Sequence, residues 1–318
     1  MNRFVILAIL FATIICTSCE KEDMFDSMYI KGLTLDNYPR VDGSTSTAPL
    51  NVIIACELLG IGYESFQDIY DDSFGMRPLL NKTTTKKFEQ RIKSSQTHQS
   101  FINLINNETD IILSARKMSP DEKSYAEAAG VRLIETPIAL DAFVILVNGS
   151  NPVGALTIEQ IQDIYTGKTT NWAALGGHDA NIIPYVRNPN SGSQELMESL
   201  VMKDKNFMQL PIASELVIII WSMAGGVSTI IDDWNGISYS VYYYLENILP
   251  LHGRQYIAVE GISPNAETIG NKSYPFTTEV YVVICSDLDK SSMVHQVYEF
   301  LQTAAGKQII RKSGYLPY

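Results

Sequence analysis

The chain has 318 residues, of which 46% are apolar and 19% charged, and its formal net charge is −11. This length exceeds one typical core and predicts a globular protein of two lobes or domains. The acidic balance excludes nucleic acid and anionic lipid headgroups as partners reached by overall attraction, because the average field repels them. A bound anion must therefore be held by a local site.

The first residues have the layout of a secretory signal peptide. Arg3 precedes an apolar run over 4–15, and the following Cys16-Thr17-Ser18-Cys19 resembles a bacterial lipobox. The run is too short for a permanent transmembrane helix. We therefore expect a lipoprotein signal peptide over 1–18, lipidation of Cys19 and a solvated tether over 19–37; a buried N-terminal helix is the alternative. The protein would then be anchored in the cell envelope, on the periplasmic or outer-surface side of an inner or outer membrane.

Cysteine and histidine usage gives no sign of a metal site. After processing, Cys56 and Cys285 remain, each in an apolar segment, which favours buried free thiols, although an oxidising compartment would permit a bridge if the two met. The four histidines are scattered and none belongs to a cluster with metal-ligand spacing. We expect no metal and no cofactor.

Helical and strand-like segments alternate along the chain, which is typical of α/β proteins. The expected helices have N-terminal caps or a proline in the first turn, and lie at Pro49–Leu59, Ser119–Ala129 and 157–165. The expected strands are apolar runs at Thr109–Ala115, Pro137–Asn148, Ile182–Val186 and Phe276–Ser286. A glycine-rich turn is expected at Gly176-Gly177.

The stretch Val186–Met197 combines an arginine with the start of a helix. Ser191 and Gln194 have capping-box spacing, and an apolar stripe follows, so we expect a helix from about Gly192. The unpaired N–H groups at such a terminus attract anions, and Arg187 with the Ser191 and Ser193 hydroxyls would add donors. The alternative is a plain helix cap with Arg187 paired to a surface carboxylate.

A second turn rich in hydroxyl groups lies about 145 residues earlier, at Asp42–Pro49. It too lies between a strand end and a helix start. Two donor-rich helix starts in separate halves suggest a cleft between lobes, although four consecutive hydroxyl residues also suit an ordinary capped turn.

Over nearly the whole mature length the chain resembles the PstS-type phosphate-binding proteins of ABC transporters, in the type II periplasmic-binding-protein superfamily. The matching segments occur in the order and at roughly the spacing of that family: "DGSTSTAPL", "TDIILSARKMSPDE", "PIALDAFVILVNGSNPVGALTIEQIQDIYTGKTTNWAALGG", "RNPNSGSQELM", "NGISYSVYYYLE", "IAVEGISPNAETIGNKSYPFTTEVYVVICS" and "AAGKQIIRKSGYLPY". The resemblance implies a two-lobe α/β fold with the ligand between the lobes and two crossover strands, at about 137–148 and 276–286. Lobe one would hold 38–140 and 280–318, and lobe two 141–279.

The resemblance also implies a set of ligand-binding residues. In the family, the ligand oxygens are held by the hydroxyl turn, by the loop before the "DI" strand and that strand's end, and by the Arg-x-x-x-Ser-Gly-Ser turn. The corresponding residues here are Ser46, Thr47, Thr97, Ser114, Arg187, Ser191, Gly192 and Ser193. Arg116 is a second, weaker candidate cation.

This chain departs from the family where a carboxylate normally accepts the proton of bound phosphate. Ala115 and Pro189 stand there, and Asp141, Asp42 and Asp110 are the nearest alternatives in sequence. If one of them is recruited, phosphate should be preferred over sulfate by at least ~100-fold, whereas a pocket of donors alone would treat the two anions alike. The Ser95–His98 loop also lacks the usual glycines, and we expect His98 to be a solvated loop histidine rather than a ligand contact.

We therefore expect a monomeric, lipid-anchored solute receptor that passes an inorganic oxyanion, most simply phosphate, to an ABC permease. A ligand-sensing or interaction protein on the same scaffold, or a binder of another oxyanion, is the alternative. An enzyme is disfavoured: a serine hydrolase using Ser191 or Ser193 would need a nearby histidine and a G-x-S-x-G elbow, which "PNSGSQE" does not provide.

Overall fold

The computed structural model describes residues 29–68, 73–207, 218–220 and 223–318. The expected signal peptide and Cys19 lie outside these residues. Of the expected tether, 29–37 is described, and its apolar side chains Ile30, Leu33 and Leu35 are buried. This part of the chain therefore belongs to the folded domain and is not a solvated tether, because its apolar residues pack on the core.

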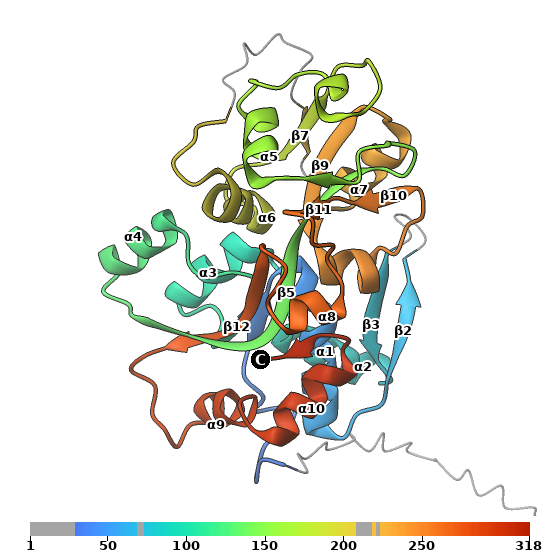
Figure 1. Ribbon diagram of the computed structural model, residues 1–318. Helices are drawn as coiled ribbons and strands as arrows, with labels where there is room; N and C mark the ends of the chain where they lie inside the picture. The colour runs from blue at the N-terminus through green and yellow to red at the C-terminus, as the bar shows by residue number, and fades with distance from the viewer. Residues whose placement is uncertain (1–28, 69–72, 208–217, 221–222) are drawn as a thin grey trace, which may run out of the picture.

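One mixed sheet runs through the whole molecule and connects its two lobes (Figure 1). Its longest strand, β5 (Leu133–Asn148), belongs to both lobes. The first part of β5 pairs antiparallel with β12 (Thr277–Cys285), and the part over 143–147 pairs antiparallel with β9 (Gly236–Val241). The two segments expected as crossovers thus lie side by side at the centre.

The first lobe contains the sheet order β1-β4-β12-β5 and the helices around it. Its other strands are β1 (Val41–Gly43), β4 (Ile111–Ser114) and β13 (Leu316–Pro317). Its helices are α1 (Ala48–Leu59), α2 (Lys82–Arg91), α3 (Thr97–Ile105), α4 (Pro120–Ala128), α9 (Met293–Phe300) and α10 (Ala304–Lys312). A hairpin of β2 (Tyr63–Gln67) and β3 (Phe74–Pro78) stands at its side, and α8 (Ala266–Gly270) lies near the C-terminus.

The second lobe continues the sheet from β5 through β9 to β7 and β8. The remaining strands here are β6 (Ala155–Leu156), β7 (Ile183–Arg187), β8 (Ile218–Ile220), β10 (Arg254–Tyr256) and β11 (Ala258–Val259). The helices are α5 (Ile158–Tyr165), α6 (Gly192–Leu196) with its π-helical continuation η3 (Met197–Met202), and α7 (Met223–Asp232). Three short helical turns complete the helical elements. Turn η1 (Thr45–Thr47) precedes α1 in the first lobe, and η2 (Trp172–Leu175) and η4 (Tyr244–Ile248) belong to the second lobe.

Local sequence explains where the predicted elements begin and end. Full capping boxes start α4, through Ser119 and Glu122, and α5, through Thr157 and Gln160. Gly60 ends α1 in the left-handed conformation, with φ 66°. The predicted helices and strands are confirmed to within a few residues, and β5 begins earlier than expected, at Leu133.

Cys56 is a buried free thiol, as expected, whereas Cys285 is free but only half-buried. Across the described ranges, no helix has the length and apolar character needed to cross a bilayer. The same part of the chain holds no group of three or more His, Cys, Asp or Glu side chains suited to a metal ion.

Candidate functional site

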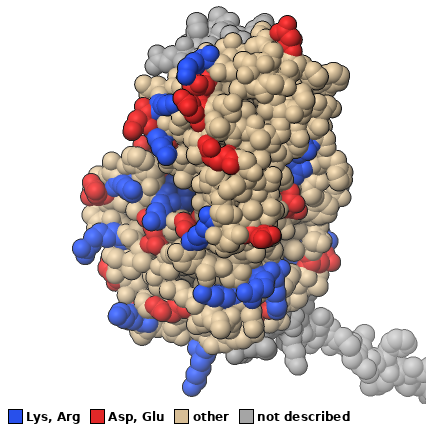
Figure 2. All heavy atoms as spheres, in the orientation of Figure 1, with Lys and Arg blue, Asp and Glu red and all other residues tan. Residues whose placement is uncertain are grey.

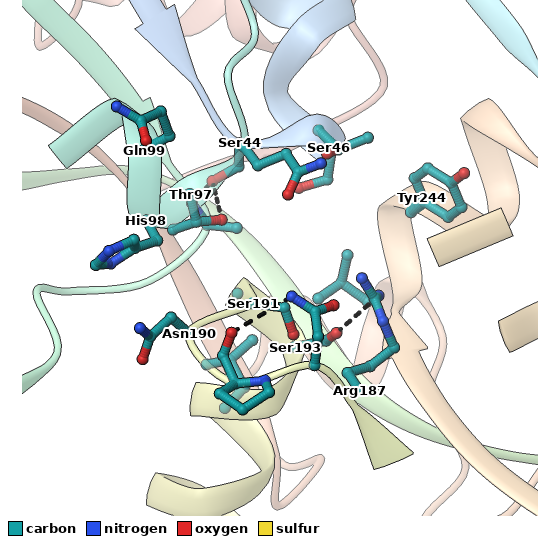
Figure 3. Close-up of a pocket in the computed structure, with 18 of the residues that line it drawn as sticks. Ser44, Ser46, Thr97, His98, Gln99, Arg187, Asn190, Ser191, Ser193 and Tyr244 are labelled. Atoms are coloured by element: carbon teal, nitrogen blue, oxygen red, sulfur yellow. Dashed lines mark hydrogen bonds between the residues drawn. The ribbon is translucent and has the colours of Figure 1, made fainter. Parts of the chain in front are cut away.

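A cavity of about 420 Å³ lies between the two lobes (Figure 3). Three stretches supply most of its lining: Ser44–Ser46, Gln96–Gln99 and Arg187–Ser193. The rest comes from the single positions Ala115, Leu196, Ala224, Val241 and Tyr244. The first two stretches belong to the first lobe, and the third belongs to the second. A ligand in this cavity would therefore contact both lobes at once.

The hydroxyl turn of the first lobe is held by the backbone of β4. Strand β1 ends at Gly43, where a Cβ atom would lie 2.4 Å from the Leu113 carbonyl oxygen, so only glycine fits. The next residue, Ser44, donates its N–H to that oxygen, and its Oγ accepts from the Ala115 N–H at 3.0 Å. Ser46, in the following turn η1, is buried and lines the cavity.

Thr97 is the first residue of α3 and joins the hydroxyl turn. Its Oγ1 lies 2.9 Å from the Ser44 Oγ. From the other lobe, Gly192 approaches so closely that a Cβ there would lie 2.5 Å from Thr97 Oγ1. The starts of α3 and α6 are therefore in contact across the cavity, and Gly192 permits that contact.

Arg187 ends β7 and is 7% exposed. Its Nη1 donates to Ser193 Oγ at 3.2 Å, and its backbone N–H donates to the Tyr239 hydroxyl at 3.0 Å. Burial lowers the pKa of the guanidinium, opposed by Tyr239 and Tyr244. The cavity lining described here includes no Asp or Glu, so Arg187 gives it a positive character.

Ser191 caps α6, because its Oγ accepts from the Gln194 N–H at 3.3 Å. Ser193 Oγ is the acceptor for Arg187. Within the described part of the chain neither hydroxyl donates a hydrogen bond, so both hydrogens are available to an anion. Among the described residues neither Oγ contacts a histidine, as a serine nucleophile would require.

Six of the eight predicted ligand residues line the cavity: Ser46, Thr97, Arg187, Ser191, Gly192 and Ser193. The other two do not, because their hydroxyl groups bind backbone carbonyls: Thr47 donates to Ser44 and Leu113, and Ser114 donates to Arg116 at 2.6 Å. Thr45, which the prediction passed over, lines the cavity in place of Thr47.

Several lining residues were missed by the sequence interpretation: Ser44, Thr45, Gln96, Gln99, Asn188, Asn190 and Tyr244. Most of them are direct neighbours of predicted residues, so the sequence indicated the correct segments but not how many residues of each segment line the cavity. His98 also lines the cavity, and its Nδ1 lies 3.0 Å from Glu122 Oε1. It is the second residue of α3 and not a solvated loop residue.

The three aspartates considered as replacement acceptors lie outside the lining. Asp42 accepts from Gly43 and Ser95 N–H groups, and Asp110 pairs with Arg40. Asp141 is buried on β5, where its Oδ1 accepts from the N–H groups of Ala142 and Tyr243. Burial raises the pKa of Asp141 to about 7, although these two hydrogen bonds oppose the shift.

Arg116, the second candidate cation, does not line this cavity. It forms an ion pair with Glu122 at 2.8 Å and lines a neighbouring cavity of about 410 Å³ between the lobes. On the visible outer face, acidic and basic side chains are interspersed (Figure 2). The face therefore offers no extended surface of one sign, and the local donors of the cavity are the anion-attracting feature.

Comparison with known proteins places this geometry in a family. In sequence, the chain is 27% identical over 255 residues to protein SphX of Synechococcus elongatus, covering 75% of this chain and 74% of that protein. It is 20% identical to the phosphate-binding protein PstS of Borreliella burgdorferi, covering 99% of each chain.

Solved structures share the fold. A putative phosphate ABC transporter substrate-binding protein from Clostridium perfringens, solved with bound phosphate, matches with a TM-score of 0.62 and 24% identity, over 87% of this chain and 98% of the other. An ABC-type phosphate transport receptor from Vibrio cholerae matches with a TM-score of 0.59 and 20% identity, over 87% and 98%. Residues 65–304 match the family model described as the PBP superfamily domain, and the chain belongs to this family.

Proposed function

We propose that this protein captures phosphate in the cavity between its lobes and delivers it to an ABC permease. The observation that carries the proposal is the buried Arg187 with hydroxyl groups from both lobes around one cavity that has no described carboxylate. The names of relatives support the ligand, since PstS and the structural neighbours are called phosphate-binding or phosphate transport proteins.

The proposed binding mode uses hydrogen bonds and charge only. Arg187 and the hydroxyl groups of Ser191 and Ser193 would hold the anion on the second lobe, and Thr97 and the Thr45-Ser46 turn would hold it on the first. Binding to both sets favours the closed arrangement of the lobes, because only that arrangement satisfies all donors. The family is one of solute-binding proteins, which are not enzymes, and this mode needs no nucleophile or general base.

Calorimetry on the chain from residue 26 onward tests the proposal. Phosphate should bind with a 1:1 stoichiometry, and Arg187→Ala should abolish most of the affinity. Sulfate and a small organic phosphate serve as competitors that define the ligand class. Absence of measurable phosphate binding to the folded wild-type protein would refute the proposed function.

We further propose that the protein is held at the membrane by acyl chains on Cys19. The lipobox-like Cys16–Cys19 sequence supports this, and the described domain has no helix that could replace the anchor. Cys19→Ser should give unprocessed or released protein in cell fractionation. A variant that is processed normally and stays with membranes as wild type does would contradict the anchor.

The lobe boundaries stay a prediction as well. We propose residues 38–140 with 280–318 as lobe one and 141–279 as lobe two, and the first boundary is supported by β5, whose partners change from β12 to β9 between Ala142 and Phe143. The second boundary is less well supported, because α8 and the start of β12 lie with the first lobe. A monomer is expected because each chain supplies both sides of the cavity.

A further inference from the structure

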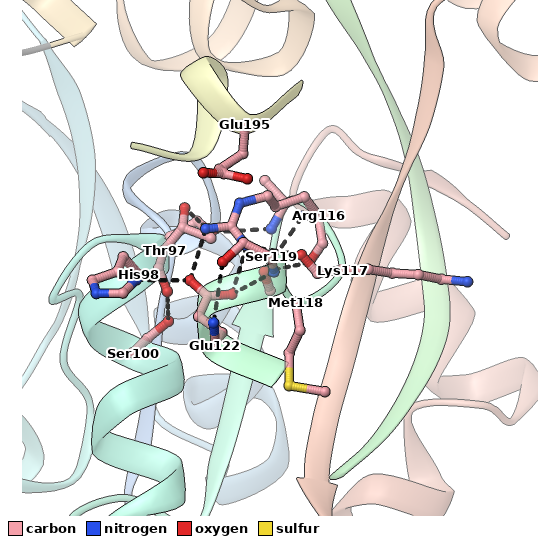
Figure 4. Close-up of polar contacts among 12 residues, drawn as sticks. Thr97, His98, Ser100, Arg116, Lys117, Met118, Ser119, Glu122 and Glu195 are labelled. Atoms are coloured by element: carbon pink, nitrogen blue, oxygen red, sulfur yellow. Dashed lines mark hydrogen bonds and ion pairs between the residues drawn. The ribbon is translucent and has the colours of Figure 1, made fainter. Parts of the chain in front are cut away.

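Arg116 is fixed in place by a buried carboxylate of its own lobe (Figure 4). It is 5% exposed, and its Nη1 and Nη2 donate to the two oxygens of Glu122, each at 2.8 Å. Burial alone would raise the pKa of Glu122, but the hydrogen bonds and charge of Arg116 outweigh it, with help from the Ser119 N–H and His98, and lower the pKa. The guanidinium is therefore positioned without any contribution from the other lobe.

One edge of this guanidinium has no hydrogen-bond partner among the described residues. An arginine has five N–H donors, and Arg116 uses only its Nη groups, for Glu122 and for the Lys117 carbonyl oxygen. The Nε atom is buried and makes no hydrogen bond in the described part of the chain. The Nε and Nη2 edge has the fork geometry that binds a second carboxylate with two parallel hydrogen bonds.

Glu195, on α6 of the second lobe, faces this edge. Figure 4 shows its carboxylate on the side of the Arg116 guanidinium opposite to Glu122. The carboxylate has no hydrogen bond or ion pair to any described residue, and both side chains line the cavity of about 410 Å³. Burial raises the pKa of Glu195, Arg116 opposes the shift, and the carboxylates of Glu198, Glu122 and Asp121 add to it.

Glu195 does not line the anion cavity, but it lies on the same short helix as residues that do. Ser193, two residues earlier on α6, lines the anion cavity, and Leu196, the residue after Glu195, lines both cavities. Any change in the position of α6 relative to the first lobe therefore changes the placement of Ser191 and Ser193 at the anion and of Glu195 at Arg116 together.

We propose that Glu195 is a positioning residue that pairs with the free edge of Arg116 when the lobes close, and so holds the closed form around the bound anion. This inference rests on the proposed function. Because Glu122 already fixes Arg116, the pair forms without ordering the guanidinium, and only the Glu195 side chain loses freedom. The residue contacts no ligand and acts through the lifetime of the closed state.

The direction in which Glu195→Gln changes phosphate affinity distinguishes this role from a purely electrostatic effect. If Glu195 acts only through its negative charge near the anion, then Glu195→Gln tightens phosphate binding. If it holds the lobes closed, the same change weakens binding, with phosphate dissociating about 3- to 10-fold faster at an unchanged association rate, because loss of a partner in such a pair acts mainly on dissociation. Glu127→Gln, an exposed glutamate of α4 without a described partner, removes the same charge and serves as the control.

The experiment is stopped-flow and calorimetric measurement of phosphate binding to the mature full-length wild type, Glu195→Gln and Glu127→Gln at pH 8. Faster dissociation in Glu195→Gln alone supports the interlobe pair. Equal or tighter binding in Glu195→Gln overturns it while leaving the proposed function standing. Wild-type protein that binds no phosphate overturns both.

Discussion

The two buried arginines of the cleft, Arg187 and Arg116, differ in what they face. Arg116 has the carboxylate oxygens of Glu122 at 2.8 Å, whereas Arg187 has the neutral Ser193 hydroxyl at 3.2 Å and a cavity whose described lining contains no carboxylate. A buried cation with an internal counter-ion stabilises the fold only while the pair is intact, and one that lines a polar cavity is suited to bind an anion. The same residue type thus has a structural role in one place and a ligand-binding role in the other.

Removing Arg116 gives the largest effect that we expect, and it falls on stability. Arg116→Met leaves the fully buried Glu122 without its counter-ion, which should lower the free energy of unfolding by about 3–5 kcal/mol. Urea unfolding of the two proteins measures this. A loss below about 1 kcal/mol would mean that Arg116 and Glu122 are not a structural pair, by the scale of exposed ion pairs.

Removing Arg187 should instead affect binding. Arg187→Ala should weaken phosphate binding by about 2–5 kcal/mol, the range for truncating one partner of a buried, hydrogen-bonded charge pair. The ligand-free protein should lose little thermal stability, and Arg187→Lys should recover only part of the affinity, since an ammonium lacks the guanidinium fork. If Arg187→Ala bound phosphate like wild type in calorimetry, the contrast between the two arginines would disappear.

Asp141 shows a third way in which the protein accommodates a buried ionisable group, because burial favours its protonated, neutral form. The negative charge of Asp141 raises the pKa values of three neighbouring tyrosines, Tyr242, Tyr243 and Tyr315. The pKa of Asp141 itself is raised to about 7 by burial, and no cation is among the groups that affect it. Its Oδ2 is buried and makes no hydrogen bond to the described residues. Burial therefore disfavours the ionised form in the folded protein.

The sign of the pH effect follows from the raised pKa. Well below pH ~4 the carboxyl group is neutral in both the folded and unfolded states; as pH rises from there toward about 7, the unfolded state ionises first, so stability is lost. Asp141→Asn keeps the Oδ1 acceptor and should be more stable than wild type at pH 8 by up to about 4 kcal/mol, with little difference at pH 4. Unfolding curves across this range measure it, and parallel pH profiles would contradict it.

The fold was largely predictable because its signals are local. The capping boxes at Ser119 and Thr157 and the apolar run of β5 fix their elements from a few adjacent residues. The β2–β3 hairpin was not foreseen, since its strands are short, partly exposed and mix polar and apolar residues without a clear alternation.

The candidate site was predictable where its polar residues are close together in the sequence, as in Arg187–Ser193. The hydroxyl turn was displaced by one residue because η1 directs Thr47 toward the Leu113 carbonyl, a contact made 66 residues away in sequence. The pair of Arg116 with Glu122 and the burial of Asp141 depend on tertiary packing, which no spacing rule reports. Binding residues within one segment could therefore be predicted from the sequence, whereas the partners of buried charged groups could not.

Anion selectivity is the smallest effect and the finest test of the Arg187 cavity. The expectation of a recruited carboxylate loses its support, because Asp42, Asp110 and Asp141 all lie outside the described lining. The remaining acceptors are neutral amide and hydroxyl oxygens, including Asn188 and Asn190. A neutral hydrogen bond to the proton of HPO₄²⁻ contributes about 1 kcal/mol, so we now expect phosphate to be preferred over sulfate by only about 5-fold. Competition of sulfate against phosphate at pH 8 measures the ratio. A preference of 100-fold or more would require a charged acceptor at the anion, and an Asp141→Asn variant that lost it would return that role to Asp141.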